Sequence, residues 1–172
     1  MDAEMKMYPQ PASIPVKNRE WLNHELTKSP IWCSVDLRDG NQALPMPMNP
    51  EKKFEYFKLL CQIGFKEIEV SFPSASQDDF EFVRELIERR EIPSDVRISV
   101  LTQAREPLIR RTVESLVGLD KGILHLYIAT SDLHEKIVFN KTREETLKVA
   151  VEGTKSVIRY LKEFGLYGKI SY

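Results

Sequence analysis

Short apolar segments rich in β-branched residues alternate along the chain with longer segments of helical periodicity. The short segments are bounded by polar, glycine or proline positions, which is typical of buried parallel strands. On this basis five strands are predicted, at Ile31–Leu37, Lys66–Ser71, Val96–Thr102, Ile123–Ala129 and Gly168–Tyr172.

The segments between these strands carry apolar residues at helical spacing and recognisable start signals. The predicted starts are Asn49–Glu51, Ser74–Gln77, Pro107 and Thr142–Glu145. Gly64 and Gly165 predict the ends of the first and last of these helices. A further helix, near Asn18–Thr27, is predicted ahead of the first strand.

This strand–helix alternation indicates βαβ units and therefore an α/β fold with a parallel sheet. Right-handed crossovers leave two architectures, an open doubly wound sheet or a closed eight-stranded barrel. No glycine-rich phosphate loop follows any predicted strand, which disfavours a dinucleotide-binding sheet. The pattern alone does not choose between the two architectures.

Composition and charge argue against proteins that bind nucleic acid or a membrane. The 172 residues are 42% hydrophobic and 30% charged, with a formal net charge of −1. This balance gives no basic surface for nucleic acid or for an anionic membrane, and no apolar run reaches the roughly 18 residues of a membrane helix. Residues 1–17 lack the apolar core of a signal peptide, so a cytoplasmic location is expected. Cys33 and Cys61 have no metal-ligand spacing, and neither a disulfide nor a catalytic role is expected for them.

Polar side chains gather where the first predicted strand ends. Asp36–Gln42 holds two carboxylates, one guanidinium and two amides within seven residues. Divalent cations prefer carboxylate oxygen, and a substrate carboxylate or developing oxyanion prefers arginine. The alternative is an ordinary polar turn with an Asp–Arg pair, and the residues by themselves favour neither interpretation.

Two other strands carry candidate residues. Glu69 alternates with apolar residues, so its side chain is predicted to face the interior, where it needs a partner such as Arg38. Structural pairing and direct catalysis are equally compatible with that position. His125 and Tyr127 share one face of the fourth strand, although a lone histidine on an apolar strand is more often a core residue.

The segment SVDLRDGNQAL at residues 34–44 resembles the signature of metal-dependent, acyl-CoA-condensing enzymes built on a TIM barrel. That family includes 2-isopropylmalate, homocitrate and citramalate synthases and lyase relatives. Residues 68–86, 100–112 and 124–145 are similar in particular to the longer type of 2-isopropylmalate synthase. The match runs from about Pro30 to the last residue.

The resemblance implies a (β/α)8 TIM-barrel fold, of which the chain holds about the first four and a half repeats. Residues 1–29 are then an N-terminal arm and helix, and residues 30–172 the first part of the catalytic barrel, ending in strand five. A barrel left open in this way is expected to expose two sheet edges and an apolar inner face, and so to self-associate.

The resemblance also implies roles for individual residues. Asp39 is expected to bind a divalent metal (Mg, Mn or Zn), with Gln42 beside the metal. Arg38 is the expected catalytic residue, because it would polarise the 2-oxo group and stabilise the alkoxide. The 2-oxo acid pocket is expected to be lined by Arg38, Glu69, His125 and Tyr127.

The implied reaction is the condensation of acetyl-CoA, as co-substrate, with 2-oxoisovalerate, an acyltransferase step of leucine biosynthesis. The parent enzyme is expected to be a homodimer. The family completes its metal site with a His-x-His pair, and the three histidines here, His24, His125 and His134, form no such pair. The chain by itself is therefore expected to be inactive. The alternatives are a non-catalytic half-barrel scaffold or assembly partner, and a homocitrate or citramalate synthase.

Overall fold

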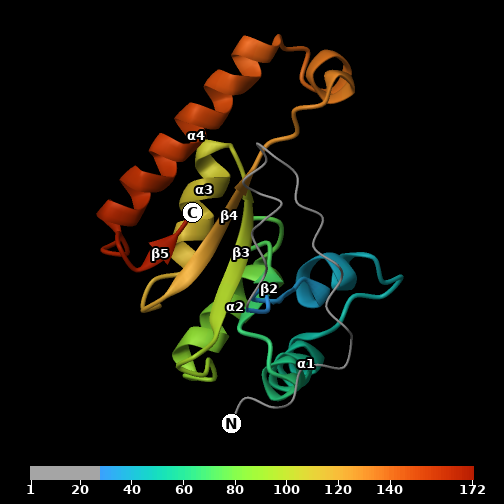
Figure 1. Cartoon of the computed structure of the whole chain (residues 1–172), viewed down its shortest axis with the longest axis vertical. Helices are drawn as coiled ribbons and strands as arrows, with labels where there is room; N and C mark the ends of the chain where they lie inside the picture. The colour runs from blue at the N-terminus through green and yellow to red at the C-terminus, as the bar shows by residue number, and fades with distance from the viewer. Residues whose placement is uncertain (1–27) are drawn as a thin grey trace, which may run out of the picture. The chain divides into compact units, whose positions relative to one another are not determined.

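The computed structural model describes residues 28–172, so the helix predicted at Asn18–Thr27 lies outside the described residues. The chain divides into two compact units, Met1–Pro30 and Ile31–Tyr172, and the second contains the sheet. Five parallel strands lie side by side in sequence order (Figure 1). They are β1 (Cys33–Ser34), β2 (Glu67–Ser71), β3 (Arg97–Gln103), β4 (Gly122–Tyr127) and β5 (Ile170–Ser171).

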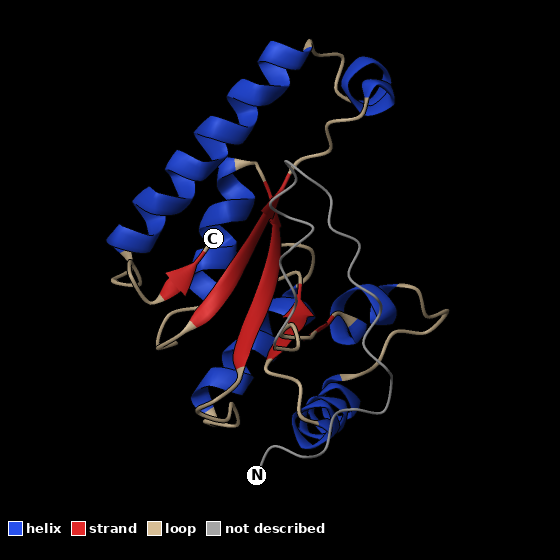
Figure 2. Ribbon diagram, in the orientation of Figure 1, coloured by secondary structure: helices blue, strands red, loops and turns tan. Residues whose placement is uncertain are grey.

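Helices connect the strands (Figure 2). They are α1 (Pro50–Ile63), α2 (Gln77–Glu88), α3 (Glu106–Ser115) and α4 (Arg143–Glu163), with short π-helical turns η2 (Asp36–Gly40) and η3 (His134–Val138). Asn49 caps α1, and Gly64 ends it in a left-handed conformation at φ 108°, as predicted. The predicted capping box of Thr142 and Glu145 is confirmed at the start of α4.

The predicted capping box at Ser74–Gln77 is wrong. Ser76, not Ser74, is the extended residue directly before α2, and its hydroxyl accepts the backbone N–H of Asp79. The cap therefore lies two residues later than predicted. The reason is that Ser76 is the residue whose oxygen reaches the third amide of the helix.

The first predicted strand is also shorter than expected. β1 has two residues, whereas Ile31 and Trp32 are exposed and the chain turns into η2 after Val35. The backbone N–H groups of three successive residues, 38 to 40, converge on the carbonyl of Val35, which starts the turn. Leu37 is consequently buried from a helical turn and not from a strand.

The sequential strand order excludes a doubly wound sheet for the described residues, because that architecture reverses its strand order at a switch point. The apolar side chains of the sheet point towards the helices and form one buried core with them. Its sheet residues are Ile68, Val70, Ile98, Val100, Leu124 and Ile170, and its helix residues include Phe57, Leu60, Phe82, Leu86, Ile109, Val113, Val157 and Leu161.

The opposite face of the sheet is mainly polar. Strand register and alternation place on it Glu67, Glu69, Arg97, Ser99, Gln103, His125 and Tyr127. Leu101 and Ile123 are the apolar exceptions on this face of β3 and β4. The expectation of an apolar inner face is therefore wrong, because most apolar side chains of the strands point towards the helices and pack in the core.

In residues 28–172, no helix is long and apolar enough to cross a membrane.

Candidate functional site

The turn η2 holds Arg38 next to the carboxyl end of β2. The Arg38 Nε donates to Oε1 of Glu69 at 2.5 Å, and its Nη1 donates to Oδ1 of Asp39 at 2.8 Å. The Arg38 side chain is 17% exposed, so most of it is covered. Since η2 follows β1 directly, the geometry of this turn decides where the guanidinium points.

Glu69 links the first two strands to the fourth. Its side chain is only 4% exposed, and its second oxygen, Oε2, lies 2.7 Å from Nδ1 of His125. Each oxygen of this buried carboxylate therefore has a hydrogen-bond partner. We call these three residues, Arg38, Glu69 and His125, the inner-face cluster.

The contact with Glu69 also sets the state of the His125 ring. An ionised carboxylate only accepts hydrogen bonds, so Nδ1 of His125 carries a hydrogen. In the neutral imidazole, Nε2 is then left as an acceptor. The His125 side chain is 49% exposed, so this nitrogen is available to a ligand on the inner face.

Tyr127 lies two residues further along β4, about 7 Å beyond His125 on the same face. Its hydroxyl accepts a hydrogen bond from Nε2 of Gln103 at 2.8 Å. Sequence reasoning did not assign a site role to Gln103. Its place opposite Tyr127 follows from the β3–β4 register, which residue spacing along the chain does not reveal.

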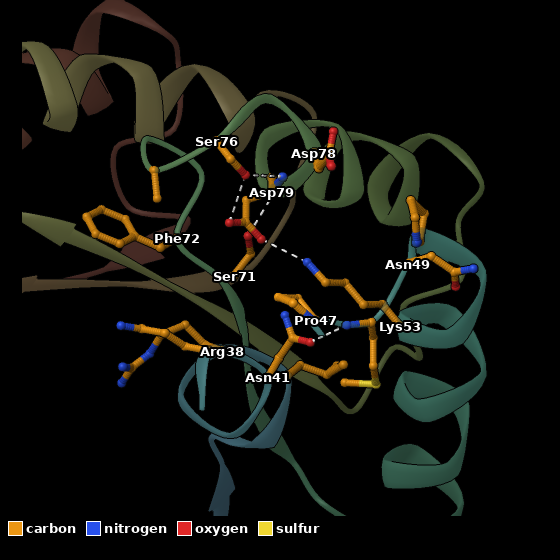
Figure 3. Close-up of a pocket in the computed structure, with 15 residues that line it drawn as sticks. Arg38, Asn41, Pro47, Asn49, Lys53, Ser71, Phe72, Ser76, Asp78 and Asp79 are labelled. Atoms are coloured by element: carbon orange, nitrogen blue, oxygen red, sulfur yellow. Dashed lines mark hydrogen bonds and ion pairs between the residues drawn. The ribbon is translucent and has the colours of Figure 1, made fainter. Parts of the chain in front are cut away.

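Gln42 does not join the inner-face cluster. It is exposed and lines a hollow of about 800 Å³ between η2, the start of α1 and the β2–α2 loop, which Arg38 also borders (Figure 3). In this hollow the buried Lys53 donates to Asp79 at 2.9 Å, and Asn41 accepts the backbone N–H of Met48 at 2.7 Å. Figure 3 shows these two contacts facing one another across the hollow.

Asp39 was expected to bind a metal, and the structure leaves its side chain 64% exposed beside Arg38. One guanidinium and the carboxylates of Asp39 and Glu69 lie in this region. A divalent ion nevertheless needs several ligands. Residues 28–172 contain no group of three His, Cys, Asp or Glu side chains placed to hold one. The donors present therefore do not fit a complete metal site.

Cys33 lies on β1 opposite Glu67. Partial burial raises the pKa of its thiol, and the negative charges of Glu69 and Glu67 raise that pKa further. At neutral pH the thiol therefore stays protonated, which makes it a poor nucleophile. Burial likewise raises the pKa of the Cys61 thiol.

Known proteins resemble the chain over most of its length. A sequence model of the HMGL-like family matches residues 29–168. A 2-isopropylmalate synthase of Schizosaccharomyces pombe is 58% identical over 153 residues, which are 88% of this chain and 26% of that protein. The synthase of Clostridium acetobutylicum is 52% identical over 147 residues, which are 86% of this chain and 26% of that protein.

The synthase of Thermobifida fusca is 54% identical over 155 residues, 90% of this chain and 27% of that protein. The chain thus spans about a quarter of the length of the curated relatives it matches. The family match includes η2, β2, β3 and β4, which carry the inner-face cluster and the residues beside it. The chain belongs to the HMGL-like family.

Proposed function

We propose that the chain forms the 2-oxo acid-binding part of a 2-isopropylmalate synthase, which condenses acetyl-CoA with 2-oxoisovalerate. The observation that carries the proposal is the inner-face cluster, in which a buried carboxylate fixes a guanidinium and an imidazole towards one face of the sheet. The named relatives, which are 52–58% identical to the chain, support the same reaction.

Arg38 is the group that acts on the 2-oxo acid. Glu69 holds its Nε and Asp39 its Nη1, so the unoccupied N–H groups of the guanidinium keep one orientation. When the methyl carbon of acetyl-CoA attacks the 2-oxo carbon, negative charge develops on the former carbonyl oxygen. A fixed guanidinium stabilises this alkoxide without reorganising, which is the main electrostatic contribution a site of this kind can make.

His125 and Tyr127 position the substrate. Nε2 of His125 can accept a hydrogen bond, and Tyr127 presents a hydroxyl already oriented by Gln103. Leu101 lies opposite His125 on the same face and is buried beside the cluster.

The metal role of Asp39 stays a prediction. Because the described residues do not fit a complete divalent site, the chemistry derived above involves only Arg38, Glu69, His125 and Tyr127. For the same reason we expect the 172-residue chain to show no turnover by itself. Turnover comparable to that of an intact synthase would contradict this expectation.

A segment exchange tests the function. Residues 31–168 replace the matching segment of the Clostridium acetobutylicum synthase, and the chimera is assayed with 2-oxoisovalerate, 2-oxoglutarate and pyruvate. We expect activity with 2-oxoisovalerate to be highest. Arg38→Ala in the chimera should lower kcat by at least about 100-fold, as loss of an oxyanion donor does. The matched control, Lys52→Ala, removes an exposed charge from α1 and should keep full activity.

The other outcomes identify the alternatives. Preference for 2-oxoglutarate or pyruvate would make the chain part of a homocitrate or citramalate synthase. A folded chimera without activity towards any of the three acids would favour a non-catalytic scaffold or assembly partner.

A further inference from the structure

The turn η2 is only weakly held by its own hydrogen bonds. The backbone nitrogens of residues 38 to 40 all lie within 3.2 Å of one acceptor, the carbonyl oxygen of Val35. A carbonyl oxygen has two lone pairs, so three donors cannot all form full hydrogen bonds with it. The strand before the turn, β1, has only two residues and gives little further support. The orientation of η2 therefore depends on contacts at its other end.

Asn41 makes those contacts. It follows η2 directly, and its backbone N–H donates to the carbonyl oxygens of Arg38 and Asp36. The residue is buried, and its Oδ1 accepts the backbone N–H of Met48 at 2.7 Å, seven positions further along the chain (Figure 3). Asn41 thus binds the end of η2 with its backbone and the segment before α1 with its side chain.

The loop between these two partners has little else to hold it. Pro45 and Pro47 have no backbone N–H to donate. Leu44 and Met46 have exposed side chains, which contribute little to the core. The hydrogen bond to Asn41 is therefore the contact that closes the loop.

The far end of the loop is firmly anchored. Met48 packs against the hydrophobic core, and Asn49 caps α1. The Lys53 side chain, which is only 6% exposed, donates to Asp79 at 2.9 Å and so joins the first turns of α1 and α2. Asn41 consequently ties η2 to a point that the core and two helices hold in place.

The position of Arg38 depends on this tie. Arg38 lies in η2, three residues before Asn41, and its Nε meets Oε1 of the buried Glu69 at 2.5 Å. A displacement of about 1 Å at a group that acts on a substrate can lower the rate by about 100-fold. Movement of η2 would displace the guanidinium in this way.

We propose that Asn41 is a positioning residue for Arg38. Its side-chain oxygen binds the Met48 amide and thereby holds η2 in the orientation in which the guanidinium meets Glu69. The consequence for the reaction rests on the proposed function, in which Arg38 acts on the 2-oxo acid. The consequence for the contact between Arg38 and Glu69 is independent of that function.

The test compares Asn41→Ala with the matched control Asn49→Ala in the full chain by nuclear magnetic resonance. Both asparagines line the same hollow and accept one backbone N–H each. In Asn41→Ala, exchange of the Met48 amide hydrogen should accelerate by about tenfold or more, as loss of a hydrogen bond implies. The Nε–H signal of Arg38 should also lose the shift that its bond to Glu69 causes. Asn49→Ala should keep the Arg38 signal, although α1 loses its cap.

A conservative variant and a ligand titration separate positioning from a structural role. Asn41→Asp retains an acceptor for the Met48 amide, so it should restore the Arg38 signal. Titration with 2-oxoisovalerate in the presence of Mg²⁺ should give about tenfold weaker binding for Asn41→Ala and unchanged binding for Asn49→Ala. If Asn41→Ala does not fold, Asn41→Gln takes its place with the same expected results, because it moves the amide by one methylene.

An Arg38 signal that changes in Asn41→Ala, recovers in Asn41→Asp and persists in Asn49→Ala would support the assignment. An unchanged signal in Asn41→Ala, or an equal change in Asn49→Ala, would overturn it, since Asn41 would then only stabilise the loop. Absence of 2-oxoisovalerate binding by the unmodified chain would count against the proposed function instead, and the Arg38 signal would still decide the role of Asn41.

Discussion

At the scale of single residues, Glu69 determines the geometry of the candidate site. Arg38 comes from the turn after β1 and His125 from β4, and they meet because both bind one carboxylate on β2. Alternation with apolar residues predicted that Glu69 faces inward and needs a partner such as Arg38, and the structure contains that pair. The sequence could not predict its second partner, since the contact with His125 spans 56 positions and depends on strand register.

Glu69→Gln should destabilise the chain by about 2 kcal/mol, because it replaces two charge-assisted hydrogen bonds in a site that is 4% exposed. Urea unfolding measures the loss. The control is Glu67→Gln, which breaks the pair with Arg97 on the same face of the sheet. That pair is more exposed, so its loss should cost under about 1 kcal/mol. Equal effects of the two substitutions would show that Glu69 is an ordinary surface carboxylate.

Asp39 is the residue whose predicted role the described structure supports least. Since residues 28–172 offer no group of three ligands, titration with Mg²⁺, Mn²⁺ or Zn²⁺ should show no site tighter than about 10⁻⁴ M. Any weak binding should be unchanged in the control variant Asp132→Ala, which removes an exposed loop carboxylate. Tight binding that Asp39→Ala abolishes would contradict the conclusion that the donors are incomplete.

At the scale of elements, helices that begin with a capping residue were the most predictable. Asn49 and Thr142 start α1 and α4 as predicted, because their side-chain oxygens satisfy amides that no other group reaches. The first strand was less predictable. The apolar run that begins at Ile31 indicates a strand up to Leu37. In the structure, three backbone N–H groups bind the carbonyl of Val35, so the residues after Val35 form the turn η2 instead. That turn places Arg38 in the candidate site.

The contact between α4 and the β3–α3 turn depends on a glycine. A Cβ on Gly153 would lie 2.9 Å from Cβ of Ala104 and 3.3 Å from its Cα. Helix propensity alone predicts that Gly153→Ala stabilises the chain by about 1 kcal/mol. We expect a net loss of about 1 kcal/mol instead, measured by thermal or urea unfolding, because overpacking against backbone costs more.

The double variant Gly153→Ala/Ala104→Gly separates the two effects, since it removes the clash while keeping alanine in the helix. It should recover part of the lost stability relative to Gly153→Ala. Stabilisation by Gly153→Ala alone would mean that α4 does not approach this turn closely.

At the scale of the whole molecule, the described unit is a parallel α/β sheet of TIM-barrel type with strands in sequence order. Strand–helix alternation predicted the parallel sheet, and the resemblance predicted the barrel family. Alternation could not by itself decide between a barrel and a doubly wound sheet, because both contain the same βαβ units. The polar character of the inner face was also missed, although Glu67, Glu69 and Arg97 occupy alternate strand positions.

Self-association is still expected, for a reason other than an apolar inner face. β1 and β5 each have one neighbour in the described sheet, and apolar side chains are exposed beside β1 at Ile31 and Trp32 and on η3 at Ile137. Light scattering at micromolar concentration should give a mass above the 20.0 kDa of one chain. Trp32→Ser/Ile137→Ser should shift the mass towards the monomer. A sharp monomer peak for the unmodified chain would contradict the expectation.

The central claim is that Arg38, Glu69 and His125 together bind a 2-oxo acid. The most direct test follows the histidine ring signals by nuclear magnetic resonance while 2-oxoisovalerate is added to the chain in the presence of Mg²⁺. The account predicts saturable shifts of the His125 signals that Arg38→Ala abolishes and Lys52→Ala preserves, with His134 as an unshifted internal reference. Unchanged His125 signals, or shifts that persist in Arg38→Ala, would contradict it.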